Sequence, residues 1–108
     1  MEAIALEKLR RICLALPQAV ETTSFGHPTF RAGKKTFAVL EWYKGELCLA
    51  FKVGAEHKDL FLRDSRFFST PYIGKHGWIS LRITGRLRWT EVKHLVTESY
   101  GLVTQKRR

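Results

Sequence analysis

The sequence predicts one α+β domain over residues 1–108, built as two layers with helices packed on one face of an antiparallel β-sheet. A chain of 108 residues has the size of a single domain with one hydrophobic core. Apolar residues recur with three-and-four spacing near both ends of the chain, which indicates amphipathic helices, and alternate with polar residues in the middle, which indicates strands. Since most strands follow one another through short turns, the sheet is expected to be antiparallel.

The first 28 residues are expected to form a helix and a loop. Leu9, Ile12 and Leu16 share one face of a helix over residues 3–16, while charged residues take the other face. Pro17 ends this helix, because proline has no backbone N–H to continue its hydrogen bonds. Residues 18–28 include the stretch TTSFGHP and are expected to be a loop.

Residues 29–53 are expected to form a meander of three strands, with turns at residues 32–34 and at Lys44 and Gly45. The second of these turns fixes a hairpin register. In that register the following side chains face each other on the core side: Trp42 and Leu47, Leu40 and Leu49, Ala38 and Phe51. The opposite face then carries Phe37, Val39, Glu41, Tyr43, Cys48, Ala50 and Lys52. This set is too apolar to be left wholly to water, so we expect something to cover it or bind it.

The second half of the chain is expected to contain two helices and at least one strand. Residues 56–63 form a short helix with Leu60 and Phe61 facing inward, and His57 is weighed as a third inward residue. Residues 64–77 are irregular. Residues 78–83 alternate as a strand whose core face holds Ile79, Leu81 and Ile83. The last helix covers residues 90–103, and its buried stripe consists of Val92, Leu95, Val96, Ser99, Leu102 and Val103.

The charge of the chain is strongly positive. Nineteen Lys and Arg residues stand against ten Asp and Glu residues, which gives a formal net charge of +9. Residues 63–108 hold ten of these cations and only three of the anions, so most of the excess lies in the second half. Such a field attracts phosphate groups in nucleic acid, nucleotides or anionic lipid. The alternative is a general surface rich in lysine and arginine, with residues 106–108 as a solvated tail.

Four sequence motifs follow one another along nearly the whole chain. They are LALPQAVET after the first helix, FGHPTFR followed by GKKTFAV, then PYIGKHGWISL, and finally WTEVKHLVTESYGLV. Together they resemble the MmcQ/YjbR-like family, small bacterial proteins described as DNA-binding domains of the double-wing type. The resemblance implies an α+β fold similar to that of the frataxin-like CyaY proteins, and it implies DNA as a partner.

Basic residues are found at two of the expected turns. Arg31, Lys34 and Lys35 surround the first, and Arg82, Arg86 and Arg88 surround the second, where residues 85–87 are expected to reverse the chain as a hairpin. Two such basic wings would hold a nucleic-acid backbone through phosphate contacts, which carry no sequence information. Scattered, solvated charges at turns are the alternative interpretation.

The stretch over residues 71–78, PYIGKHGW, offers a second candidate site. Gly74 and Gly77 permit close backbone approach or positive φ, and Lys75 with His76 would add positive charge to a phosphate cradle. In the competing interpretation the stretch is a structural corner, with Pro71, Tyr72 and Trp78 packed over the open sheet face or beginning the strand. We favour the corner for those three residues and leave the role of Lys75 and His76 open.

No catalytic or metal-binding constellation is recognisable. Ser24 and His27 lie in a motif that holds no Asp or Glu to orient the imidazole, and a turn built on Gly26 and Pro28 accounts for the same residues. The four His and two Cys residues show no paired ligand spacing. Cys13 and Cys48 are expected to be buried and reduced, and without a signal peptide or a membrane span the expected compartment is the cytoplasm.

These observations predict a monomeric, non-enzymatic domain without cofactor that binds nucleic acid, with DNA the expected partner. The candidate binding residues are Arg31, Lys34, Lys35, Lys75, His76, Arg82, Arg86 and Arg88. A protein-interaction or small anionic-ligand module that uses the corner at residues 71–78 is the alternative.

Overall fold

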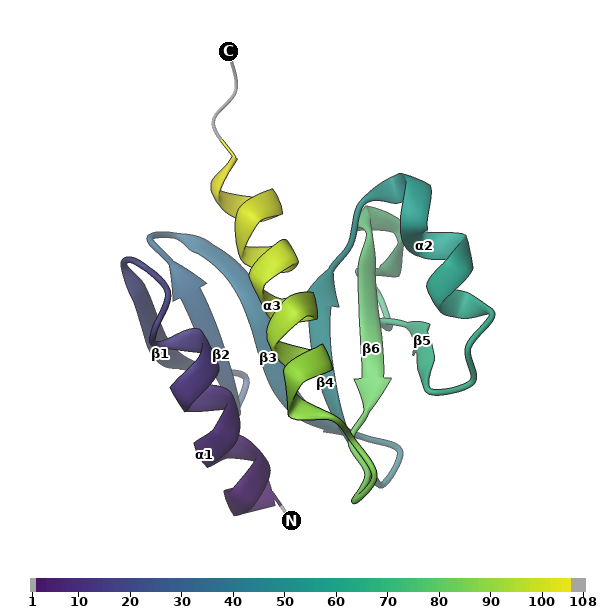
Figure 1. Cartoon of the computed structure of the whole chain (residues 1–108), viewed down its shortest axis with the longest axis horizontal. Helices are drawn as coiled ribbons and strands as arrows, with labels where there is room; N and C mark the ends of the chain where they lie inside the picture. Colours follow the sequence, from purple (N-terminus) through teal and green to yellow (C-terminus); the bar gives the residue numbers. More distant parts are fainter. Residues whose placement is uncertain (1, 106–108) are drawn as a thin grey trace.

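Six antiparallel strands form one sheet in the order β1-β2-β3-β4-β6-β5, and α1 and α3 pack on one of its faces (Figure 1). The computed structural model describes residues 2–105, so the basic tail over residues 106–108 lies outside the described part of the chain. The elements in chain order are α1 (Glu2–Cys13), β1 (Ala19–Ser24), β2 (His27–Ala32), β3 (Lys35–Tyr43), β4 (Glu46–Lys52), α2 (Ala55–Leu62), β5 (Phe67–Ser69), the 3₁₀ helix η1 (Gly74–His76), β6 (Trp78–Arg82) and α3 (Trp89–Thr104). The expected α+β fold with helices on one face of an antiparallel sheet is confirmed. None of the helices within residues 2–105 is long and apolar enough to cross a membrane.

The hydrophobic core lies between the sheet and the two long helices. Helix α1 buries Leu9 and Cys13, and α3 buries Val92 and Val96. The strands contribute Phe30, Leu40, Leu49, Phe51, Ile79 and Leu81, each of which is nearly inaccessible to water. Burying apolar area of this kind is the main favourable term in folding, so these positions fix the arrangement of the layers.

The β3–β4 hairpin has the predicted register. Ala38 pairs with Phe51, Leu40 with Leu49, and Trp42 with Leu47. Lys44 and Gly45 both have positive φ, 51° and 80°, which is typical of a two-residue type I′ turn. Trp42 differs from its partners because it lies near the end of β3, where it is half exposed and its indole N–H donates to Glu2 Oε1 at 2.8 Å.

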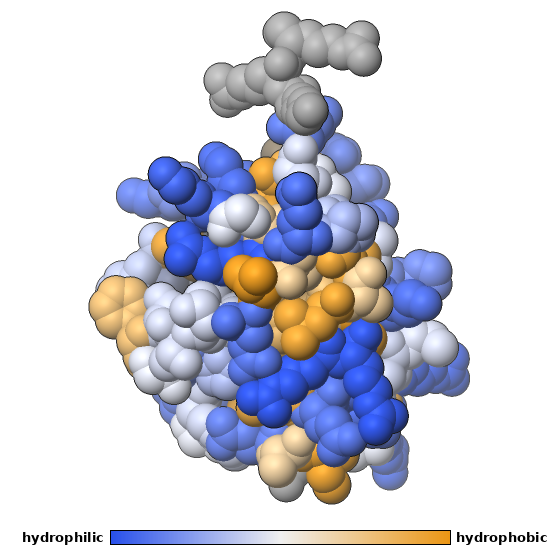
Figure 2. Space-filling view, turned by 90° about the vertical axis from the view of Figure 1, so that its left-hand side faces the viewer, coloured by the Kyte–Doolittle hydropathy of each residue, from blue (hydrophilic) through white to orange (hydrophobic). Residues whose placement is uncertain are grey.

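The expected loop over residues 18–28 is wrong, because these residues form a second hairpin. Strand β1 pairs with β2 in register, with Ser24 opposite His27, and Phe25 and Gly26 make the positive-φ turn. β1 is an edge strand on the side of the molecule that Figure 2 shows, and most of its side chains are polar or partly exposed. It therefore lacks the apolar alternation that identifies a strand in a sequence. The irregular segment expected over residues 64–77 likewise contains the short edge strand β5.

A β-bulge in β3 overturns the expectation for Phe37. Phe30 pairs with Ala38 but Arg31 pairs with Thr36, so Phe37 is the extra residue and turns towards the helices. Its ring packs edge-to-face on Tyr100 of α3, with centroids 5.3 Å apart. Beside the bulge, the buried Ser99 hydroxyl accepts from the Lys52 N–H at 2.8 Å and donates to the Phe37 carbonyl at 2.7 Å. Ser99 thus joins β3 to β4 one position beyond the last pair of their ladder, Ala38 and Phe51.

Helix α2 packs less tightly than the other helices. It stands over β5, apart from α3 (Figure 1), and none of its residues is fully buried. Phe61 packs inward against Phe51 and Phe67, as expected. The inward placement of Leu60 is wrong, because 62% of its surface is exposed, and His57 is exposed as well. Both residues face the open space between α2 and α3, because α3 does not seal this side of α2.

No helix within residues 2–105 covers the second face of the sheet (Figure 1). Tyr72 does not cover this face, since 96% of its surface is exposed, which corrects the expectation for that residue. The rings of Tyr43 and Phe68 stack at a centroid distance of 5.7 Å instead. Around them, the small residues Cys48 and Ala50 are buried although no second layer covers them. Part of the apolar face is therefore covered by side chains of the sheet itself.

Candidate nucleic-acid interface

The structure divides the predicted basic residues between the two ends of the sheet. Because the strands are antiparallel, the start of β3, the end of β4 and the start of β6 lie at the same end of the sheet. The pairs Ala38–Phe51 and Phe51–Ile79 lie near this end. Five predicted residues belong to this end: Arg31, Lys34, Lys35, Lys75 and His76. The other three, Arg82, Arg86 and Arg88, belong to the opposite end, where β6 runs into α3. The nine residues of β3 separate the two groups by about 27 Å.

We call the first group the basic end, together with two lysines that the sequence did not single out. It consists of Arg31, Lys34, Lys35, Lys52, Lys58, Lys75 and His76. Lys52 is the last residue of β4, and Lys58 lies in the second turn of α2. In Figure 1 this end is at the top, where the β2–β3 turn, the start of α2 and the end of α3 lie.

One part of the basic end is the β2–β3 turn. Lys34 and Lys35 are exposed there, and Gly33 supplies the positive φ of 62° that the reversal needs. Arg31 has a different role, because its Nη2 donates to the Lys34 carbonyl at 3.0 Å and so holds the turn. Its Nε is buried and has no hydrogen-bond partner within residues 2–105. The turn therefore presents two free ammonium groups on a backbone that Arg31 supports.

The other part of the basic end is a hollow of about 510 Å³. It lies between the end of β4, the start of α2 and the 3₁₀ helix η1. Its basic lining residues are Lys52, Lys58, Lys75 and His76, and its acidic ones are Glu56 and Asp59. The Lys58 ammonium donates to the Gly74 carbonyl at 2.6 Å, which ties α2 to η1. The hollow thus has three lysines, one of which also has a structural contact.

The two glycines of this segment are required by its geometry, as predicted. Gly77 has φ of +89°, and a Cβ at this position would lie 3.0 Å from the Val53 carbonyl oxygen. The Gly77 carbonyl also accepts from the Val53 N–H at 2.8 Å. A Cβ on Gly74 would collide with Ser69 Oγ. Both glycines therefore let η1 lie close to its neighbours, which places Lys75 and His76 beside Lys52.

The cations of the basic end are not used in ion pairs within the part of the chain that the structure describes. None of its lysines or Arg31 forms an ion pair within the described residues, whereas Arg10, Arg11, Arg66 and Arg82 all do. An unpaired ammonium group keeps its full attraction for a phosphate, while a paired one must first give up its carboxylate. Unpaired positive charge is therefore grouped at the basic end, although Lys44, Arg63, Arg86 and Arg88, which lie outside it, also lack an ion pair within residues 2–105.

The opposite end is less available to a polyanion. The guanidinium of Arg82 lies 3.3 Å from Glu46 Oε1, donates to the Ser65 carbonyl at 2.7 Å and sits over the Phe68 ring. Residues 84–88 turn between β6 and α3, with the Leu87 N–H donating to the Thr84 carbonyl at 3.1 Å, but they do not form a hairpin because a helix and not a second strand follows. Arg86 and Arg88 are exposed on this connection. Only these two of the three predicted arginines have free side chains.

The residues weighed for catalysis and metal binding have structural explanations. Ser24 and His27 close the β1–β2 hairpin on either side of its turn. Within residues 2–105 no three His, Cys, Asp or Glu side chains lie close enough together to hold a metal ion. Cys13 and Cys48 are buried and not bonded to each other. Burial raises the pKa of both thiols, that of Cys48 to about 11, so both remain protonated at neutral pH.

Two solved structures have the same fold. A crystal structure of the Deinococcus radiodurans protein DR2400, described by the domain name DUF419, is similar with a TM-score of 0.79 at 24% identity, over 94% of this chain and 79% of that one. A crystal structure of a protein from Pseudomonas syringae is similar with a TM-score of 0.75 at 15% identity, over 90% of this chain and 97% of that one. No curated protein matches the sequence. The YjbR family matches residues 14–102, and the chain therefore belongs to the YjbR family.

Proposed function

We propose that this chain is a non-enzymatic domain that binds the phosphate backbone of nucleic acid, with DNA the expected partner, through the basic end. One observation carries the proposal: the lysines of the β2–β3 turn and of the hollow beside η1 lie at the same end of the sheet and have no ion-pair partners within residues 2–105. Phosphate contacts of this kind give affinity and fix orientation without reading the bases.

The other elements fit weak, largely sequence-independent binding. Helix α3 has no continuous basic face that would suit the major groove, because Lys93 and His94 alternate with Glu91 and Glu98. A monomer suffices for the proposed contacts, since both parts of the basic end belong to one chain. The two free thiols fit a reducing compartment such as the cytoplasm.

Fluorescence anisotropy with labelled duplex and single-stranded DNA, across a series of salt concentrations, tests the proposal. If about four ammonium groups neutralise phosphates, the logarithm of the affinity for duplex should fall against the logarithm of salt concentration with a slope of about −3.5. Replacing Lys34 and Lys35 together by Ala should reduce the magnitude of that slope by about 2. Both side chains are exposed, so the fold should be unaffected.

The matched control replaces Arg86 and Arg88 by Ala. It removes the same charge from exposed positions at the opposite end of the sheet. We expect the salt slope of this variant to stay within about half a unit of the original. Equal losses in the two variants would mean that net charge alone drives binding, and the basic end would lose its special role.

The hollow beside η1 supports a second candidate function, the binding of a small anionic ligand. Three lysines and the start of α2 surround a space of about 510 Å³, which is within the usual range of small-molecule sites. Lys75→Ala would then abolish saturable binding of inorganic phosphate, observed by NMR, while Lys34→Ala and Lys35→Ala would leave it unchanged. Loss of DNA binding in the turn variants, without saturable phosphate binding, would favour nucleic acid.

A further inference from the structure

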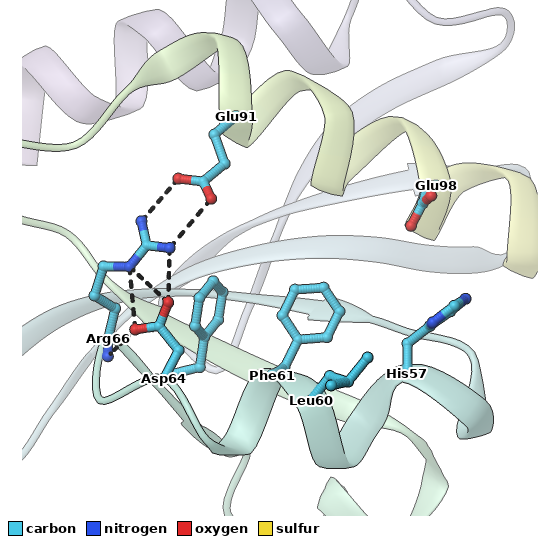
Figure 3. Close-up of a pocket in the computed structure, with 8 residues that line it drawn as sticks. His57, Leu60, Phe61, Asp64, Arg66, Glu91 and Glu98 are labelled. Carbon is cyan, nitrogen blue, oxygen red and sulfur yellow. Dashed lines mark hydrogen bonds and ion pairs between the residues drawn. The ribbon is translucent and has the colours of Figure 1, made fainter.

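A groove of about 360 Å³ separates α2 from α3, on the side of the molecule that carries the helices (Figure 3). Its floor is aromatic, made by Phe61 and Phe67, and Leu60 stands at its wall. Charged residues line its two ends: Asp64, Arg66 and Glu91 at one, and His57 with Glu98 at the other (Figure 3). The groove shares no residue with the hollow of the basic end.

The apolar lining of the groove is partly exposed: Phe67 is buried and Phe61 partly buried, whereas Leu60 is open to water. Leu60 exposes 62% of its surface, and α2 contains no fully buried residue. Phe61 packs its inner side on Phe67, at a centroid distance of 5.1 Å, while the groove lies along its other side. Exposed apolar surface with a charged rim is typical of a surface that binds a partner.

The first end of the groove is a fixed ion-pair network. Arg66 Nη1 lies 2.8 Å from Glu91 Oε1, and Arg66 Nη2 lies 2.8 Å from Asp64 Oδ2. The hydrogen bonds from Arg66 hold the pKa of Asp64 below its usual value. This network ties the segment after α2 to the first turn of α3, so it keeps the two walls of the groove at a set separation.

The second end has free negative charge. Glu98 forms no ion pair or side-chain hydrogen bond within the described residues, and it points from α3 towards the space above His57 (Figure 3). The lining has three carboxylates against one guanidinium, a formal charge of −2 with His57 neutral. The whole chain carries +9, so this groove has the opposite sign to its surroundings. A cationic partner is attracted here and repelled elsewhere.

The groove is elongated. A hollow of about 280 Å³ shares His57 and Glu98 with it and continues past Glu56 to Gln105, near the end of α3. A third hollow shares Arg66 and Glu91 and continues along the first turns of α3 to His94. The 16 residues of α3 span about 24 Å, so the hollows together follow most of this helix. A space of this shape suits a short segment of polypeptide better than a compact small molecule.

We propose that the groove between α2 and α3 binds a short amphipathic helix of a partner protein, with apolar residues on one side and lysine or arginine residues beside them. The apolar side of that helix packs on Leu60 and Phe61, and a basic residue pairs with Glu98. Recognition of an amphipathic helix by an apolar groove with complementary charge is a common mode of peptide binding. The groove itself shares no lining residue with the hollow of the basic end, although its continuation towards Gln105 meets that hollow at Gly54, Glu56 and Leu102.

The test uses two synthetic peptides of about three helical turns, one made of leucine and lysine and the other with glutamate in place of lysine. Binding to the isotope-labelled full chain is followed by NMR. The lysine peptide should perturb the amide signals of α2 and α3 and saturate, although the chain itself is basic. The glutamate peptide should leave these signals unchanged. Saturable binding of the glutamate peptide in the groove, or perturbations from the lysine peptide outside α2 and α3, would overturn the proposal.

Single substitutions with matched controls complete the experiment. Leu60→Ser and Glu98→Gln should each weaken binding of the lysine peptide at least about fivefold. Leu62→Ser and Asp59→Asn are the controls on α2, because neither residue lines the groove, and they should change the affinity less than about twofold. All four side chains are substantially exposed, so the variants should fold. Equal effects in the test and control variants would refute the assignment of the groove.

Discussion

Replacing Ser99 by Ala should destabilise the fold far more than the loss of one hydroxyl group suggests. Ser99 is inaccessible to water, and its Oγ joins the Lys52 N–H of β4 to the Phe37 carbonyl of β3. Without the hydroxyl both backbone groups are left without a partner in a dry environment. Each such group costs about 1–3 kcal/mol, while alanine recovers about 0.5 kcal/mol of helix propensity.

The net loss in the free energy of unfolding should therefore be about 3 kcal/mol, a large part of the total for a domain of this size. The midpoint of thermal unfolding should fall by roughly 10–15 °C. Urea denaturation followed by tryptophan fluorescence measures the free energy, and an unchanged m-value would show that the variant keeps its fold. Thr97→Ala, at an exposed position two residues earlier on α3, is the matched control and should be neutral within about 0.5 kcal/mol.

Hydrogen exchange gives the local readout of the same variant. The Lys52 amide should exchange faster in Ser99→Ala, relative to amides at the centre of β4, because its acceptor is gone. A loss below about 1 kcal/mol with unchanged protection of Lys52 would refute the reasoning. It would show that β3 and β4 close the gap at the bulge by themselves.

Two further predictions concern Gly77 and Asp64. Gly77→Ala should lower the free energy of unfolding by at least about 1–2 kcal/mol, because the φ of Gly77 is +89° and the new Cβ would press on the Val53 carbonyl. Urea denaturation measures this loss, and Gly85→Ala, the control, should be nearly neutral in the same assay. Similar costs for the two alanines would contradict the argument. The carboxyl pKa of Asp64 is lowered by hydrogen bonds from Arg66, so its contribution to stability is present above the unfolded pKa of about 4 and is lost as the pH falls through the lower folded value. Asp64→Asn should therefore lose less stability than the original chain as the pH falls below about 4. Thermal unfolding across a pH series measures this difference, and the same dependence of stability on pH in both proteins would count against the ion pair.

The parts of the fold with regular apolar spacing could be predicted from the sequence. The stripe of α3 and the β3–β4 register follow from side-chain periodicity and from the turn at Lys44 and Gly45. Phe37 could not be placed, because a bulge shifts the alternation by one residue and its contacts with Tyr100 and Ser99 are distant in the sequence. β1 was missed because the side chains of an edge strand need not alternate in polarity.

The candidate interface was predicted in part. The sequence identified Lys34 and Lys35 and the glycines that shape η1, because turns and positive φ leave a clear local signature. Lys52 and Lys58 were missed, since only the pairing of β4 with β6 brings them beside Lys75. The sequence placed Arg82, Arg86 and Arg88 at a second turn, but it could not show that this turn lies at the opposite end of the sheet from the β2–β3 turn. The distance between the two turns depends on the direction in which each strand runs, and the number of charges in the sequence does not reveal that direction.

The two outer strands of the sheet affect how the molecule behaves at high local concentration. β5 has only three residues, and β1 is mostly polar, with Glu21 held by Arg10 of α1. Short or polar borders are poor templates for pairing with another chain, and proteins use them to avoid fibrils. Neighbouring copies of the chain can therefore lie close together without joining their sheets into an aggregate.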